Sequence, residues 1–231
     1  ADRMRISPVR GCEFHCQFCT CNNQKYREIP IETLEQAVEA ALRDLNHPPR
    51  HVLISGGTPK TEAESYEYLN RVYRFFPRKY AEYEFDVMLS PRGLYADRND
   101  ESAYEDFLKY LHEDCGISTL SVNLELYNEN VRKTYIPEKY AIGKERYMQF
   151  IRKAVAVFGQ GKIRSSLVVG LEDKEDTLAG VRELAACGCI PVLSAFVPAQ
   201  GTFMERYPAP KVEFLLEVVH EAAEIARQNH T

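Results

Sequence analysis

The sequence lacks the long apolar run of a membrane-spanning helix, since none of its hydrophobic stretches approaches about 20 residues. No signal-peptide pattern opens the chain. Neither sign of charge dominates, because 29 Lys and Arg residues face 34 Asp and Glu residues, for a net charge of −5. That balance argues against nucleic acid or an anionic membrane as the main partner. We therefore expect no nucleic acid and no membrane among the partners.

Internal repeats, low-complexity tracts and long linkers are also absent. The chain has 231 residues, of which 45% are apolar and 27% charged, so it has enough material for a sizeable core. We predict one domain over residues 1–231. The abrupt start "ADRMRIS" and the short stretch after the last helix-like segment leave two readings open. The chain is either a trimmed core or a protein with an open side for a bulky substrate or partner.

Cysteine, in contrast, is plentiful and clustered. Four of the seven cysteines fall within "RGCEFHCQFCTC", near the start of the chain. A secreted disulfide scaffold would be shorter and more regularly spaced, whereas clustered cysteines in a cytosolic protein more often bind metal or do redox chemistry. We therefore expect a reducing, cytoplasmic location and a metal site in this segment.

Short β-branched or apolar runs alternate with segments of helical spacing along the chain. The strand-like runs cover residues 3–9, 51–55, 85–90, 118–125, 162–171 and 190–197. The helix-like segments cover residues 31–45, 62–76, 101–113, 144–158, 174–186 and 211–228. Thr61 and Asp100 stand where helix N-caps are expected. Six strand–helix units in a row predict an α/β fold with a parallel sheet, either doubly wound or curved into a barrel.

Polar and glycine-rich stretches follow the predicted strands. The cysteine cluster follows the first strand, and the later ones are followed by "SGGTP", "SPRG", "NLELYN", "GLED" and "VPAQGT". Ligands of parallel-sheet folds gather beyond the carboxyl ends of the strands. We therefore expect the functional site on this rim.

The spacing of Cys12, Cys16 and Cys19 is C-x3-C-x2-C. A structural zinc site usually takes four protein ligands in two pairs. Three thiolates on one loop can instead hold three irons of a cubane cluster and leave the fourth iron open. A zinc ion held with the help of Cys21 or His15 stays the alternative, and in the cluster interpretation Cys21 is a bystander.

The segment "CEFHCQFC" resembles the cluster motif of the radical S-adenosylmethionine (radical SAM) superfamily, C-x3-C-x-aromatic-C, with Phe18 at the aromatic position. The later motifs are most similar to those of the biotin synthase-like subgroup. The resemblance implies a partial (βα)6 TIM-like barrel that binds a 4Fe-4S cluster and S-adenosylmethionine. It also implies that the reduced cluster cleaves S-adenosylmethionine to a 5′-deoxyadenosyl radical, which abstracts hydrogen from an unidentified substrate. An electron donor such as a flavodoxin or ferredoxin is the implied partner.

The resemblance also assigns residues to the methionine part of the cofactor. Gly56, Gly57 and Thr58 stand where the family has a Gly-Gly-Glu-like motif for the amino group, with Thr58 replacing the acidic residue. Arg146, in "KERYM", stands where the subgroup has an arginine that pairs with the carboxylate. Arginine suits this role because its guanidinium binds carboxylates bidentately.

Ribose and adenine contacts are implied on the next strands. Asn123 and Glu125, in "NLELYN", match the ribose-binding positions, and on a strand they would point to the same face. "SLVVGLED" matches the family's strand-five pattern loosely. The apolar adenine slot is expected to consist of Phe18, Val168, Gly170 and Val197.

One departure limits the possible reactions. Arg164 stands where biotin synthase has a cysteine for its sulfur-donating cluster, so sulfur insertion by that route is not expected. Arg92, Tyr95 and Arg164 are candidates for substrate contacts, and a surface role is equally open for each. The reaction type, whether lyase, mutase or transferase, stays open. An iron–sulfur electron carrier and a zinc-stabilised α/β module are the alternative protein classes.

The three remaining cysteines, Cys115, Cys187 and Cys189, are expected to be small buried apolar residues. Cys187 and Cys189 fall between a helix end and a strand start, which is the rim opposite the predicted site.

Overall fold

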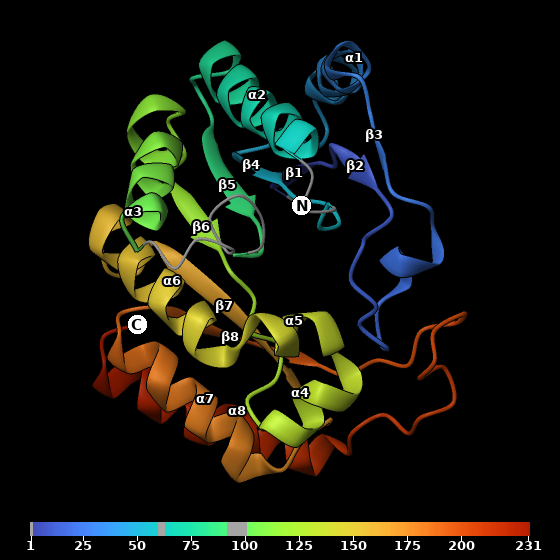
Figure 1. Cartoon of the computed structure of the whole chain (residues 1–231), viewed down its shortest axis with the longest axis vertical. Coiled ribbons are helices and arrows are strands. Elements are labelled where there is room, and N and C mark those ends of the chain that lie inside the picture. The colour runs from blue at the N-terminus through green and yellow to red at the C-terminus, as the bar shows by residue number, and fades with distance from the viewer. Residues whose placement is uncertain (1, 60–62, 92–100) are drawn as a thin grey trace.

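A computed structural model describes residues 2–59, 63–91 and 101–231 (Figure 1). Its centre is a parallel sheet in the order β1-β4-β5-β6-β7-β8, which leaves β1 and β8 at the two edges. The strands are β1 (Arg3–Ile6), β4 (His51–Ile54), β5 (Glu84–Met88), β6 (Thr119–Ser121), β7 (Ile163–Val169) and β8 (Ile190–Ala195). Their spatial order follows the chain order, as in a barrel built from successive strand–helix–strand units. The predicted partial (βα)6 barrel is confirmed.

Helices connect the strands and cover the outside of the curved sheet (Figure 1). They are α1 (Ile31–Leu42), α2 (Ala63–Lys79), α3 (Glu101–Lys109), α6 (Lys144–Phe158), α7 (Lys174–Ala186) and α8 (Val212–Gln228). A π-helical turn, Tyr110–Asp114, continues α3. These bounds agree with the predicted segments to within a few residues. The predicted caps Thr61 and Asp100 lie outside the described residues.

The main core lies between the sheet and its helices. Val52 and Ile54 of β4 and Val87 of β5 are at most 1% exposed and belong to one apolar cluster with Val72 and Phe76 of α2. Alternation along a strand sends these side chains outward and their neighbours toward the inside of the barrel. Among the described residues, no helix combines the length and apolar character needed to cross a membrane.

Several short elements were not predicted. An antiparallel pair, β2 (Val9–Arg10) and β3 (Arg27–Glu28), brackets the cysteine segment, which contains the 3-10 turn η1 (Thr20–Asn23). Two short helices, α4 (Glu129–Tyr135) and α5 (Pro137–Ile142), fill the connection between β6 and α6. Asn128 caps α4 through bonds to the amides of Asn130 and Val131. Helices of six and seven residues are too short to give a clear apolar period.

All seven cysteines are free thiols. Cys115 and Cys189 are buried, as predicted, whereas Cys187 is only partly buried. Cys187 follows the end of α7 and Cys189 precedes β8, so this pair lies at the amino end of the last strand, opposite the cysteine loop.

Candidate functional site

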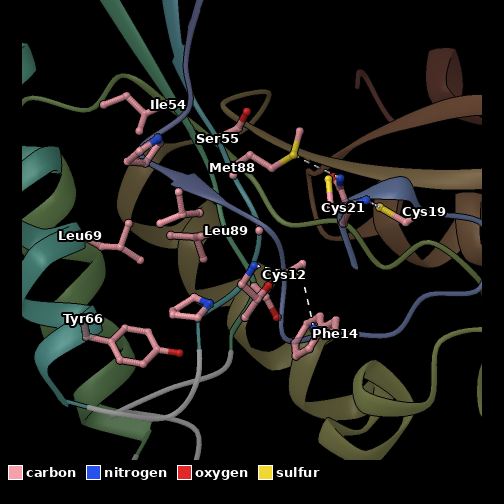
Figure 2. A pocket seen from close by; sticks show the side chains of 18 of the residues that line it. Cys12, Phe14, Cys19, Cys21, Ile54, Ser55, Tyr66, Leu69, Met88 and Leu89 are labelled. Atoms are coloured by element: carbon pink, nitrogen blue, oxygen red, sulfur yellow. Dashed lines mark hydrogen bonds between the residues drawn. The ribbon is translucent and has the colours of Figure 1, made fainter. Parts of the chain in front are cut away.

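A cavity opens at the carboxyl ends of the strands, where the sequence predicted the site (Figure 2). Its lining includes the predicted residues Cys12, Cys16, Cys19, Gly56, Gly57, Thr58, Asn123 and Glu125. The cavity also extends to side chains of α2 and α3, among them Tyr66, Leu69 and Phe107. Segments that are far apart in the sequence therefore meet around one space.

The cysteine loop, residues 11–21, is bonded to the loop that follows β4. The Thr58 amide donates to Cys12 Sγ at 3.2 Å, and the Phe14 amide donates to the same sulfur at 3.4 Å. In return, the Glu13 amide donates to the Thr58 carbonyl at 3.0 Å. Hydrogen bonds to a cysteine sulfur tune the potential of a cluster that the sulfur ligates. Cys12 therefore has the hydrogen-bond surroundings of a cluster-ligating cysteine.

Gly57 permits this contact between the two loops. A Cβ atom at position 57 would lie 1.8 Å from the Gly11 carbonyl oxygen and 2.7 Å from Cys12 Cα. Both atoms belong to the backbone of the cysteine loop, so they cannot move away as a flexible side chain could. The glycine is needed here for close approach of two backbones.

We predict that Gly57→Ala will reduce cluster incorporation several-fold, because the new methyl group pushes the cysteine loop away from Thr58. Iron and sulfide per chain after anaerobic reconstitution measure the effect. Gly56→Ala is the matched control, since its Cβ would meet mainly a side-chain methyl of Val9 at 2.6 Å and not the backbone of the cysteine loop. Equal iron content in both variants would show that the contact does not matter for loading.

Cys16 is the most buried of the three motif cysteines. It is 8% exposed and packs in a second apolar cluster that includes Phe14, Leu126 and Val168. Burial raises the pKa of Cys16 to about 12, while the positive charge of Lys139 opposes the shift. The thiol therefore stays protonated until a metal displaces its proton.

A zinc site that uses His15 gains no support from the contacts of this residue. His15 Nδ1 lies 2.6 Å from Glu138 Oε1, and the His15 amide donates to Oε2 of the same carboxylate at 2.9 Å. Across the described ranges, no group of three or more His, Cys, Asp or Glu side chains is arranged to hold one metal ion. In a cubane cluster each thiolate binds a different iron, so this finding leaves the three-cysteine prediction open.

Glu125 reaches the cavity in a different way from the one predicted. The predicted strand 118–125 is wrong at its end, because β6 stops at Ser121 and Glu125 has a φ of 69°. This left-handed conformation is uncommon for a residue with a side chain. Two backbone bonds hold it: the Glu125 amide donates to Ser166 O at 2.8 Å, and its carbonyl accepts from the Val168 amide at 2.7 Å.

Asn123 lines the cavity beside Glu125 but is already engaged. Its Oδ1 accepts from the Ser166 amide at 3.2 Å, and its Nδ2 lies 3.7 Å from Met88 Sδ. The amide side chain therefore fixes the start of the Glu125 turn as well as facing the cavity.

Lys139 is a site residue that sequence reasoning missed. Its Nζ lies 3.0 Å from Glu125 Oε1 and donates to Asn123 O at 2.8 Å. Burial alone would lower the pKa of this lysine, but Glu125, Tyr147 and Cys16 favour the charged form and hold the pKa above its usual value. No motif identifies Lys139, because it lies on the unpredicted helix α5 and reaches the site only through the fold.

The α4–α5 segment, residues 129–142, ties the cysteine loop to the Glu125 turn. On one side, Glu138 binds His15, and the Gln17 amide donates to Tyr135 O at 2.9 Å. On the other side, Arg132, which is fully buried, donates to Leu124 O at 3.1 Å and Leu126 O at 2.8 Å. The cysteine loop and the cavity wall are thus held by one structural unit.

Five predicted cofactor residues, namely Phe18, Arg146, Val168, Gly170 and Val197, are not among the described residues that line this cavity. Phe18 and Val168 pack in the apolar cluster beside the cysteines. A Cβ at Gly170 would meet Pro210 at 2.7 Å, and Val197 is 71% exposed. Arg146 is half-buried in the first turn of α6. Their roles in binding stay predictions.

The candidate substrate residues fall into two groups. Arg92 and Tyr95 lie outside the described residues. Arg164 of β7 is inside the barrel, where its Nη1 lies 3.0 Å from Oδ2 of the buried Asp86.

Comparison with known proteins identifies the family. Residues 6–185 match the model of the radical SAM superfamily. The match covers most of the chain, so the chain belongs to the radical SAM superfamily. Membership of this superfamily implies a 4Fe-4S cluster and S-adenosylmethionine as the cofactors. The family model is that of the whole superfamily, so the finer likeness to biotin synthase stays a prediction.

Individual relatives are distant. Over 112 residues, 48% of this chain and 28% of the relative, the chain is 28% identical to bacteriochlorophyllide c C-7(1)-hydroxylase of Chlorobaculum limnaeum. Among solved structures, the [FeFe]-hydrogenase maturase HydG has a TM-score of 0.71 at 16% identity, with 97% of this chain and 49% of HydG covered. A radical SAM methyltransferase from Sphaerobacter thermophilus has a TM-score of 0.72 at 15% identity, with 98% and 63% covered. These structural likenesses show the fold alone. The chain spans between about a quarter and two thirds of the length of these relatives.

Proposed function

We propose that Cys12, Cys16 and Cys19 each ligate one iron of the 4Fe-4S cluster and leave the fourth iron to S-adenosylmethionine. When bound together and reduced, these cofactors supply a 5′-deoxyadenosyl radical that abstracts a hydrogen atom from the substrate. The chain's own residues hold the cofactors in line and exclude water from them. The reaction that follows hydrogen abstraction is not assigned to a class.

The observation that carries this proposal is the hydrogen bonding between the cysteine loop and the Gly56–Thr58 loop. These bonds hold Thr58 and the two glycines beside Cys12, and we propose that the amino group of a cofactor on the open iron lies there. The Gly56 and Gly57 backbone can approach such a ligand closely. In this arrangement the Thr58 hydroxyl and nearby carbonyls replace the acidic residue of the usual motif.

We further propose that Glu125 binds the ribose hydroxyls, because its carboxylate accepts hydrogen bonds and lies on the same cavity as the cysteines. Lys139 occupies Oε1 of this carboxylate and so fixes the direction in which the other oxygen points. We also propose that Arg146 pairs with the methionine carboxylate, and the support for this pairing is the motif "KERYM".

The enzyme needs a reductant and a substrate. We propose a flavodoxin or ferredoxin as the electron donor, because a low-potential cluster requires a low-potential donor. A reducing cytoplasmic setting fits the seven free thiols.

Adding S-adenosylmethionine to the reconstituted, reduced protein tests the proposal. We expect the electron paramagnetic resonance spectrum of the cluster to change, because the methionine amine and carboxylate bind the open iron. An unchanged spectrum would favour a cluster that only carries electrons. Zinc without iron in anaerobically purified protein would instead favour a structural metal site.

A further inference from the structure

The inner wall of the barrel is polar. A complete (βα)8 barrel fills its interior with bulky apolar side chains. Here the inner wall carries Arg3 and Arg5 on β1, Asp86 on β5 and Arg164 on β7. The side chains of Arg5 and Asp86 share one face of the sheet, because both residues are in register with Leu53 of β4. The Arg164–Asp86 ion pair spans β7 and β5 on this face. The interior therefore suits a polar ligand.

Apart from Arg5, each of these charged side chains has a side-chain hydrogen-bond partner. Asp86 holds Arg164, and the Arg3 Nε donates to His51 Nε2 at 2.8 Å. Arg5 lines the cavity together with the cysteines and is exposed. Within the described ranges, Arg5 has no hydrogen-bond or carboxylate partner, and its positive charge acts on the Cys21 thiol. A guanidinium without a bonded anion thus faces the space below the predicted cofactor site.

Ser55 lies beside Arg5 and has an unused hydroxyl. The side chain is 2% exposed, and its Oγ has no hydrogen-bond partner among the described residues. The Ser55 amide donates to Ile6 O at 3.0 Å, which places Ser55 directly against β1. Ser55 lines the same cavity as Arg5 (Figure 2). A buried hydroxyl without a partner is unfavourable, so this one points to a ligand that completes the bond.

We propose that the substrate carries an anionic oxygen group, a carboxylate or a phosphate, which Arg5 binds with its guanidinium and Ser55 with its hydroxyl. The proposal rests on the proposed function, because it places this group below the cofactor. The planar guanidinium binds both kinds of oxyanion bidentately. Diagonal neighbours on adjacent strands are about 7–8 Å apart at the backbone, so the long Arg5 side chain and Ser55 can meet on one ligand.

Fluorine NMR with small probes tests the proposal without knowledge of the substrate. The probes are 3,3,3-trifluoropropionate, its uncharged amide, and monofluorophosphate. The protein is cluster-loaded, reduced and saturated with 5′-deoxyadenosine and methionine, which occupy the cofactor site and the open iron. A probe bound near the paramagnetic cluster relaxes faster.

We expect faster transverse relaxation of at least one anionic probe and no change for the amide. The anion with the larger effect identifies the group as carboxylate or phosphate. Arg5→Gln should remove at least 80% of this increase in relaxation, because the anion loses a charged hydrogen-bond partner. The control Arg3→Gln, on the same strand, should preserve the effect. Ser55→Ala should weaken binding about three-fold without lowering the thermal unfolding temperature, because its hydroxyl has no partner in the free protein.

Equal relaxation of the acid and the amide, or an effect that survives Arg5→Gln, would overturn the proposal. So would loss of S-adenosylmethionine affinity in Arg5→Gln, because Arg5 would then serve the cofactor. If the cluster does not assemble at all, the proposed function fails. Line broadening of the anionic probes by cluster-free protein then still measures whether Arg5 binds an anion.

Discussion

Replacing Cys16 with alanine will abolish cluster binding and cofactor cleavage together. Cys16 is the central cysteine of the motif and is almost fully buried, so neither water nor another side chain can take its place as a ligand. Two thiolates on a loop do not retain a cubane cluster. The measurements are iron and sulfide content, the cluster absorbance, and 5′-deoxyadenosine formed from S-adenosylmethionine under reducing conditions.

Cys21→Ala is the matched control for this prediction. Cys21 lines the same cavity and lies two residues after Cys19, and its amide lies 3.5 Å from Cys19 Sγ. Because the amide is unchanged by the substitution, we expect Cys21→Ala to retain its cluster and its cleavage activity within about two-fold. Cofactor cleavage by Cys16→Ala, or loss of the cluster in Cys21→Ala, would refute the assignment of the three ligands.

Replacing Lys139 with methionine will lower the affinity for S-adenosylmethionine at least ten-fold while the cluster still assembles. The substitution removes the lysine that binds the Glu125 carboxylate and the Asn123 carbonyl, so the left-handed turn at Glu125 loses one of its stabilising contacts. Removing one member of a buried ion pair costs about 3–5 kcal/mol, so the free energy of unfolding should also fall. Equilibrium binding of S-adenosylmethionine and chemical denaturation measure the two effects.

A double-mutant cycle separates positioning from general damage. If Lys139 acts through Glu125, the double variant Glu125→Gln, Lys139→Met should lose less binding free energy for S-adenosylmethionine than the two single variants lose in sum. Lys144→Met is the control, since this lysine of α6 donates to Tyr127 O at 3.2 Å and is not among the described residues that line the cavity. Additive effects in the cycle would contradict the positioning role, as would an equal loss of affinity in Lys144→Met.

Elements of regular length were predictable because hydrophobic periodicity is a local signal. The helices α6 and α7 have the predicted bounds, and β8 starts at the predicted residue. The elements that were missed have few residues and are stabilised by partners far along the chain. The best example is α5, whose Glu138 binds His15 across 123 positions of sequence. No window of residues carries that information.

The backbone at Glu125 illustrates a second limit. The run "STLSVNLE" alternates as a strand does, and Leu124 is buried as the pattern implies. The left-handed turn follows from bonds to Ser166 and Val168 of β7, and from Arg132 capturing the carbonyls of Leu124 and Leu126. These tertiary contacts offset the conformational cost, so local propensity could not reveal the turn.

By itself, the sequence determined the order of strands and helices, the rim on which the site lies and the three cysteines of the cluster motif. Those features depend on residue type and spacing within a few turns of chain. Only the tertiary structure decided that Lys139 contacts Glu125, that position 57 must be a glycine because the backbone of Cys12 lies against it, and that Arg5 lines the cavity without a hydrogen-bonded anion. The physical reason is that a buried charge or a close backbone contact acquires its meaning from the groups packed against it, and these come from distant parts of the chain.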